Sequence, residues 1–238
     1  MDNGSSLEQE LSSLSVLHRV AFASVCSERL LPDYLAFSTM ANWGDYGMLT
    51  GLLDTAWKHV KGHSLDHATI QNVIDACLKL APHSDLFPSH LSGLAQHAVG
   101  AVYNTLHCCL DGKASHAAAV GQLVADSVDM YLCWVGSPYI DLSDEIDEMD
   151  SLLGIDETEL SKAEQSKRTV SELQHRQNDL FEWVSQSPLM KAECERQRQE
   201  INFLRRHPDI NEEVVDQLRS HSRRCGIRLQ ARGVVRTT

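Results

Sequence analysis

The sequence predicts an all-α protein, a multi-helix bundle of about eight or nine helices with an acidic linker and a charged C-terminal helical extension. Apolar residues recur three and four positions apart almost throughout, the periodicity of amphipathic helices. No run of alternating apolar and polar residues bounded by turns indicates a strand. A chain of 238 residues is long enough to bury a large core.

A capping-box pattern opens the first predicted helix. Ser5 and Glu8 have the spacing at which their side chains bond to free backbone N–H groups at a helix start. The helical pattern continues to about Leu31. We expect Pro32 to begin the next helix, because a proline in the first turn needs no backbone N–H.

Glycine and aspartate mark the next boundaries. Trp43-Gly44-Asp45 predicts a break before a helix over residues 46–61, which Gly62 ends. Asp66 has the side chain to cap a fourth helix. One face of that helix carries Ile70, Val73, Ile74, Cys77 and Leu80.

Two long helices follow a loop at residues 81–90, which is predicted from its two prolines and its polar residues. The first has an apolar stripe of Leu91, Leu94, Ala98, Val102, Leu106 and Leu110. The second has a stripe of Val120, Val124, Val128, Tyr131, Leu132 and Val135. Only Asp111-Gly112 separates the two helices, so we expect them to be antiparallel neighbours.

Charge divides the C-terminal part of the chain. Residues 136–160 contain nine acidic residues and no Lys or Arg, which predicts a linker. The helical pattern resumes near Thr169, breaks at Pro188 and continues in a charged helix whose expected partner is a final helix over residues 209–225. The stripe of that charged helix is Met190, Cys194, Gln197, Ile201 and Leu204. The predicted organisation is a helical core domain (1–136), an acidic linker (137–165), C-terminal helices packing on or extending from the core (166–226) and a basic tail (227–238).

Composition and missing motifs exclude several classes of protein. The net charge of −12, concentrated before residue 161, disfavours nonspecific nucleic-acid binding by the core domain. No long uncharged apolar run or basic–apolar leader indicates a membrane span or a secretory signal. The seven cysteines, odd in number and without a Cys-x-x-Cys pair, favour reduced thiols in a cytoplasmic protein without structural zinc. The sequence has no Walker-type loop, dinucleotide fingerprint, His-Glu-x-x-His or Gly-x-Ser-x-Gly motif, and we predict no cofactor.

The stretch VCSERLLPDYLAFSTMANWGD, residues 25–45, carries a family resemblance. It combines Cys26-x-Glu28-Arg29, Pro32-x-Tyr34, Phe37 and Gly44-Asp45 with later motifs at 53–57, 82–85, 126–128 and 187–197. Together these motifs resemble the YjaG-like family of bacterial proteins, domain of unknown function 416, over roughly residues 14–136 and 186–206. The resemblance implies a compact, all-helical, soluble bacterial protein and supplies no reaction. This chain looks longer than typical members at about residues 141–185 and after His207.

The first candidate site consists of Glu28, Arg29, Tyr34, Asp45 and Trp57. An Arg beside a carboxylate, with a Tyr and a Trp nearby, has the chemistry to bind a small anionic or aromatic ligand. The same residues can instead fix a corner where three helices meet, with Asp45 capping one of them. The sequence leaves both interpretations open.

Other candidates are carboxylates and histidines. Asp85, Asp126 and Asp129 can face a common pocket, where they would do acid–base work or hold a divalent cation; capping and pairing are their structural alternatives. His59, His63 and His67 are four apart, but Gly62 is expected to interrupt their helix. Glu172-x-x-His175 occurs once, whereas a di-iron bundle needs two copies. Around the antiparallel helix pair a couple of histidines could converge, from the set His90, His97, His107 and His116. We predict no metal site.

Arginines give the C-terminal end a predicted positive face, comprising Arg196, Arg198, Arg205, Arg206, Arg219, Arg223, Arg224, Arg228, Arg232 and Arg236. We expect a non-enzymatic protein-interaction or accessory/regulatory protein, whose partner is another protein or a second copy in a homo-oligomer, without membrane association. One alternative is a small-molecule or metal-binding protein, or an enzyme, whose site lies near Glu28, Arg29, Asp45 and Asp85. A second alternative is nucleic-acid association through the basic tail.

Overall fold

The computed structural model describes residues 3–136 and 178–225, and every regular element in these ranges is an α-helix, as predicted. Residues 178–186 are helical and lead into α9. In these ranges no helix is both long enough and apolar enough to span a bilayer. The helices with defined bounds are α1 (Asn3–Ser12), α2 (Val16–Ala41), α3 (Tyr46–Val60), α4 (His67–Leu78), α5 (His90–Asp111), α6 (Ala114–Gly136), α9 (Pro188–Arg206) and α10 (Glu212–Cys225).

The first helical boundary differs from the prediction. α1 ends at Ser12, and α2 begins at Val16, where the Ser15 side chain accepts a hydrogen bond from the backbone N–H of His18. Pro32 lies inside α2 instead of opening a new helix. A proline there removes one backbone hydrogen bond and crowds the preceding turn. Burial of the flanking side chains offsets this cost, since α2 buries Leu30, Leu31, Tyr34 and Phe37.

The boundary signals of Asp45, Asp66 and Gly112 are confirmed, whereas Ser5 lies inside α1, which begins at Asn3. Oδ1 of Asp45 accepts the N–H of Met48 at 2.7 Å and caps α3, and Asp66 caps α4 in the same way. Gly112 ends α5 with a φ of 70°, a conformation that glycine adopts without strain.

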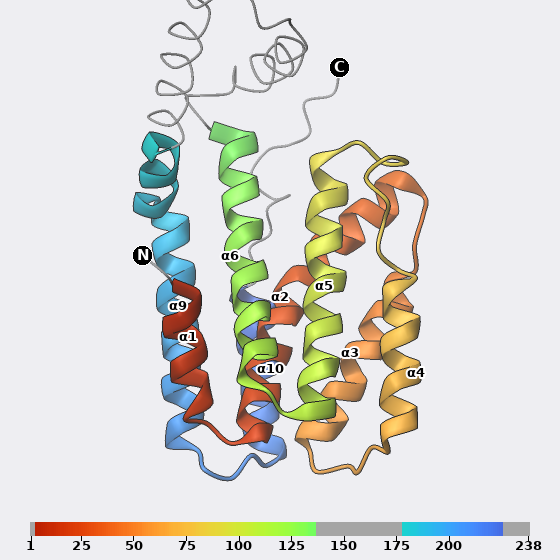
Figure 1. The fold of residues 1–238 in the computed structure, drawn as a ribbon, viewed down its shortest axis with the longest axis vertical. Helices are drawn as coiled ribbons and strands as arrows, with labels where there is room; N and C mark the ends of the chain where they lie inside the picture. Colours follow the sequence, from red (N-terminus) through yellow and green to blue (C-terminus); the bar gives the residue numbers. More distant parts are fainter. Residues whose placement is uncertain (1–2, 137–177, 226–238) are drawn as a thin grey trace, which may run out of the picture.

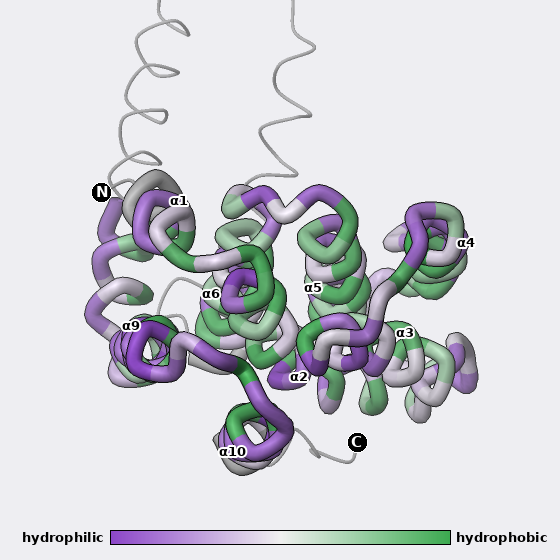
Figure 2. Tube along the Cα trace, turned by 90° about the horizontal axis from the view of Figure 1, so that it is seen from below, coloured by the Kyte–Doolittle hydropathy of each residue, from purple (hydrophilic) through white to green (hydrophobic). Residues whose placement is uncertain are grey.

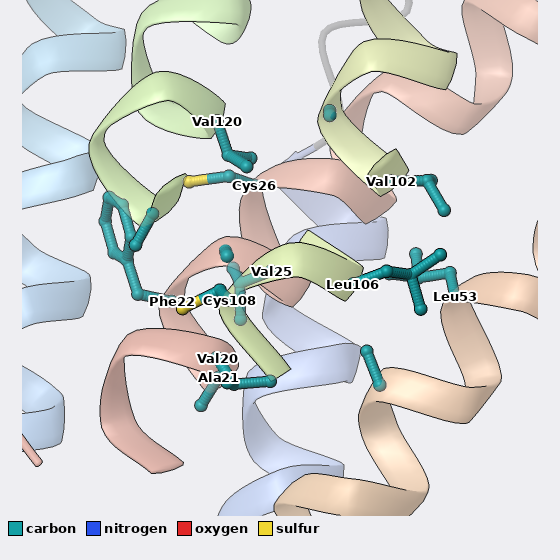
Figure 3. Close-up of a cluster of buried hydrophobic side chains, with 14 of the residues drawn as sticks. Val20, Ala21, Phe22, Val25, Cys26, Leu53, Val102, Leu106, Cys108 and Val120 are labelled. Carbon is teal, nitrogen blue, oxygen red and sulfur yellow. The ribbon is translucent and has the colours of Figure 1, made fainter. Parts of the chain in front are cut away.

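Helix α2 is the centre of the bundle. It contacts α3, α5, α6, α9 and α10. Helices α5 and α6 are antiparallel neighbours as predicted, and both pack against α2 (Figure 1). In the core, Phe22 and Cys26 of α2 meet Cys108 of α5 and Val120 of α6 (Figure 3). α1 covers α6, and α4 covers α5. A substitution in α2 therefore alters direct contacts with most of the other described helices.

The two C-terminal helices do not form the predicted pair. α9 packs against α6 and α2, whereas α10 packs against α2. Seen from below, α9 and α10 lie beside each other as separate columns next to α2 (Figure 2). α10 begins at Glu212 instead of Asp209, because the Asn211 side chain accepts the N–H of Val214 at 2.9 Å. The break before Pro188 is confirmed, whereas the acidic linker, the Thr169 helix start, Glu172, His175 and the basic tail lie outside the described residues.

Candidate functional site

Arg29 lies at the centre of a buried ionic network between α2 and α9. Its side chain is 1% exposed. Its Nη1 bonds to Oε1 of Glu200, and its Nη2 lies 2.8 Å from Oε1 of Glu193 and 3.1 Å from Sγ of Cys26. The network ties the middle of α2 to α9, and it is not the three-helix corner that was the structural interpretation of Arg29.

Further donors surround Glu193. Arg196 donates to its Oε2 at 2.6 Å, and Gln197 donates to its Oε1 at 3.1 Å. Two arginines thus face two glutamates, so the network is close to neutral. Glu200 is nevertheless buried deeply enough that desolvation raises its pKa to about 7. Burial also raises the pKa of the Cys26 thiol, which argues against a thiolate nucleophile there.

Glu28 belongs to a second network, on the α10 side of α2. Arg219 of α10 donates to Glu28 and to Asp54, each at 2.8 Å, and its guanidinium lies 5.4 Å from the ring centroid of Trp57. The Ser222 hydroxyl also donates to Glu28, at 2.6 Å. Glu28 and Trp57 therefore meet around Arg219, a residue that sequence reasoning placed on an open positive face.

Tyr34 and Asp45 lie at the corner between α2 and α3. The Tyr34 hydroxyl donates to the backbone carbonyl of Leu80 at 3.1 Å, and its ring packs against Gly44 so closely that a Cβ there would lie 2.5 Å from Oη. Asp45 is engaged as the cap of α3. Both contacts build the corner, and both are separate from the Arg29 network described above.

The remaining predicted carboxylates are separate from these networks. Asp85 is exposed in the loop before α5, and Asp126 accepts a hydrogen bond from Gln122 at 2.8 Å. Asp129 is exposed and accepts from Cys133 at 3.4 Å. Within residues 3–136 and 178–225, no three His, Cys, Asp or Glu side chains are grouped to hold a metal ion.

The histidines make local contacts. α3 ends at Val60, so of the three histidines His59, His63 and His67 it carries only His59. His107 and His116 do converge, with ring centroids 5.2 Å apart, and His116 is also 3.3 Å from Asp111. His97 bonds to Ser127, and His90 stacks on Trp134.

Sequence reasoning missed three buried carboxylates. Glu193 and Glu200 are seven residues apart, two turns of α9, and they share its buried face with Gln197, Ile201 and Leu204. The seven-residue spacing beside an apolar stripe was the signal in the sequence that could have placed both glutamates on the buried face. Asp33 is buried in α2, where desolvation raises its pKa to about 8, and no local pattern distinguishes it.

A groove of about 540 Å³ separates α9 from α10. Its buried or half-buried lining includes Glu200, Phe203 and Leu218, and its rim is polar. While Oε1 of Glu200 bonds to Arg29, Oε2 is buried and has no hydrogen-bond partner among residues 3–136 and 178–225. The groove thus adjoins the Arg29 network through one shared side chain.

Comparisons with known proteins identify the fold and the family. The family model described as "Protein of unknown function (DUF416)" matches residues 6–228. The crystal structure of a DUF416 family protein from Shewanella baltica OS155 superposes with a TM-score of 0.67 at 18% identity, covering 92% of this chain and 94% of that chain. No curated protein matches. The domain-of-unknown-function resemblance is confirmed, while the YjaG-like name is not.

Proposed function

Because this chain belongs to the DUF416 family of proteins of unknown function, we propose its function from geometry: it is a non-enzymatic accessory protein that binds a small molecule in the groove between α9 and α10. The observation that carries the proposal is the groove itself, whose lining includes Phe203, Leu218 and the Glu200 that Arg29 holds.

The size and chemistry of the groove support a small ligand. Its volume of about 540 Å³ is in the usual range for ligand pockets. Phe203 and Leu218 offer apolar surface, while Gln199, Asn202 and Gln217 supply amide donors and acceptors. This combination of apolar walls with a few polar groups is typical of ligand sites.

The predicted site residues have a supporting role in this proposal. Arg29 holds Glu200 through Oε1, and Glu28 helps to hold α10 through Arg219. They shape both walls of the groove while their own charges are engaged in ion pairs. Binding without catalysis, action as an accessory protein and a cytoplasmic location are parts of the proposal.

Native mass spectrometry tests the proposed function. The full chain is incubated with a small-molecule extract of bacterial cells, and its native mass is compared with its denatured mass. Asn202→Trp should fill the groove from its exposed rim and remove the added mass that the unmodified protein retains. Arg198→Trp, on an exposed position of the same helix outside the groove lining, is the matched control and should retain the mass. No added mass on any of the three proteins, or equal mass on all three, overturns the proposal.

A further inference from the structure

One stripe of α9 side chains lines the groove along its length. Its members follow one another at spacings of four, three and four residues, so they share one face of the helix: Glu195, Gln199, Asn202 and Arg206. All of them are exposed. The stripe has a carboxylate at one end, a guanidinium at the other end and two amides between them. The α9 wall of the groove is therefore polarised along its length.

The distance between the two charges defines the length of a ligand that meets both. Arg206 follows Glu195 by eleven residues, which separates them by about 16 Å along the axis, since each helical residue adds a rise of about 1.5 Å. A ligand of this length would carry a cation at one end and an anion at the other. An extended peptide spans at most about 3.3–3.6 Å per residue, so a peptide of about four residues with free ends fits both requirements.

Arg206 differs from the other arginines of α9. Arg196, Arg198 and Arg205 each pair with a glutamate side chain, whereas Arg206 has no ion-pair partner in the described part of the chain. A guanidinium binds a carboxylate through two parallel N–H···O bonds. The carboxylate at the end of a peptide would be such a partner.

Glu195 is the acceptor at the other end of the stripe. It pairs with Arg198 at 4.0 Å and accepts a hydrogen bond from Gln199 at 3.0 Å, and both contacts are exposed. A carboxylate has lone pairs for further donors, so these contacts leave room for an ammonium group. The other carboxylate of the lining, Glu200, is buried and already bonded to Arg29. An ammonium group in the groove therefore belongs at Glu195.

The middle of the groove matches the body of a peptide. Phe203 is half-buried and Leu218 is buried, and both offer apolar surface to peptide side chains. The amides of the α9 stripe and of Gln217 on α10 carry donors and acceptors, as a peptide bond does. Glu213 and Asp216 border an adjoining hollow on α10 and lie outside this lining.

We propose that the groove between α9 and α10 binds a short peptide with free ends, whose ammonium group meets Glu195 and whose carboxylate meets Arg206. The peptide main chain lies along the side-chain amides, and its apolar side chains lie against Phe203 and Leu218. This inference rests on the proposed function, because it names the class of ligand for the same groove. The two charges also fix the direction in which the peptide lies.

Isothermal titration calorimetry of the full chain with the tetrapeptide Ala-Leu-Leu-Ala tests the peptide site. We expect the unmodified protein to bind the peptide with free ends. The N-acetylated and the C-amidated peptides should each bind about fivefold more weakly, which is the effect of losing one exposed ion pair. Asn202→Trp, which fills the groove, should not bind the peptide.

Two variants assign the ends of the peptide separately. In Glu195→Gln, acetylation of the peptide should no longer weaken binding, whereas amidation still should. In Arg206→Gln, we expect the reverse. Arg205→Gln removes the same charge from the neighbouring exposed position outside the groove lining, and it should bind all three peptides like the unmodified protein. The substituted positions are exposed, and circular dichroism establishes that each variant is folded.

The possible failures are distinguishable. If the bacterial extract adds mass that Asn202→Trp removes, but the tetrapeptide does not bind, the peptide inference is wrong and the groove remains a ligand site. Equal binding of the free and blocked peptides overturns the inference, and so do blocking effects that persist unchanged in Glu195→Gln and Arg206→Gln. If neither the extract nor the peptide responds to Asn202→Trp, both the proposed function and the peptide site are overturned.

Discussion

Gly44 controls how closely α2 and α3 approach at their shared corner. Its φ of 84° lies in the left-handed region, and an added Cβ would lie 2.5 Å from Oη of the buried Tyr34. We predict that Gly44→Ala lowers the free energy of unfolding by about 1–3 kcal/mol, through backbone strain and the clash. Urea denaturation measures the change.

Gly51 provides the matched control for that substitution. It lies inside α3, and an added Cβ would meet no atom of the described residues within 4 Å. Gly51→Ala should therefore raise the free energy of unfolding by about 0.5–1 kcal/mol, because alanine favours the helix. Equal effects of the two alanines would contradict the explanation given for Gly44.

Among the substitutions considered, removal of the Arg29 side chain should lower the free energy of unfolding most. Arg29→Ala leaves Glu193 and Glu200 buried without their shared cation, and we predict a loss of about 3–5 kcal/mol in the free energy of unfolding. Arg198→Ala removes an exposed ion pair with Glu195 at 4.0 Å on α9 and should change the free energy of unfolding by less than about 1 kcal/mol. Urea denaturation of both variants makes the comparison, and a small effect of Arg29→Ala would show that the network is dispensable.

Asp33 should make stability depend on pH in the direction opposite to that of an ion-paired carboxylate. Its folded-state pKa of about 8 lies above the value of about 4 expected in the unfolded chain, so between these values the folded state binds the additional proton. The stability that Asp33 contributes through this proton is fully present below pH 4. It is lost as pH rises through 8, and the free energy of unfolding falls by up to about 1.4 kcal/mol per pH unit. Asp33→Asn should therefore gain stability relative to the unmodified protein from pH 5 to pH 8. Urea denaturation across this range gives both curves, and parallel curves would exclude the effect.

At the scale of the helix, Arg219 attaches α10 to the bundle. It pairs with Glu28 of α2 and Asp54 of α3, and it lies over Trp57. We predict that Arg219→Ala accelerates amide hydrogen exchange in residues 212–222 by about tenfold or more, whereas exchange in α5 changes little. Arg205→Ala, which loses a more exposed pair with Glu10 at 3.7 Å, is the control. Unchanged exchange in α10 would show that its apolar contacts suffice.

Helix boundaries that depend on neighbouring residues were predictable from sequence. Asp45, Asp66 and Gly112 act within three or four residues of their own positions, so their side chains or backbone preferences indicate the boundary directly. Pro32 was misplaced because side chains packed against α2 from other helices keep it helical. Local preference was overruled there by tertiary burial.

The candidate site was harder to predict because its contacts are distant in sequence. The partners of Arg29 in α9 are 164 and 171 residues away, and the hydrogen bond from Arg219 to Glu28 spans 191 residues. The sequence indicated that Glu28 and Arg29 belonged together as a motif. They instead point to different helices, because side chains at adjacent positions of a helix do not face each other. Only the packing of α9 and α10 on α2 shows that their partners are separate.

At the scale of the whole molecule, α2 connects the two ends of the described chain. It buries Arg29 against α9 and Glu28 against α10, while its apolar side chains pack with α5 and α6. Separation of α10 would break the Glu28 network and expose part of the apolar surface shared with Val214, Val215 and Leu218. The C-terminal helices are therefore expected to unfold together with the bundle.

A variant that retains Trp57 as its single tryptophan tests this cooperativity, because Arg219 of α10 covers the indole of that residue. We predict that urea midpoints from Trp57 fluorescence and from far-ultraviolet circular dichroism coincide, since the first reports the α10 contact and the second reports all helices. In Arg219→Ala on the same background, the fluorescence midpoint should fall below the dichroism midpoint. If the fluorescence midpoint already lies below the dichroism midpoint in the single-tryptophan protein with Arg219 intact, α10 unfolds as a separate unit. The ionic contacts would then be too weak to couple α10 to α2.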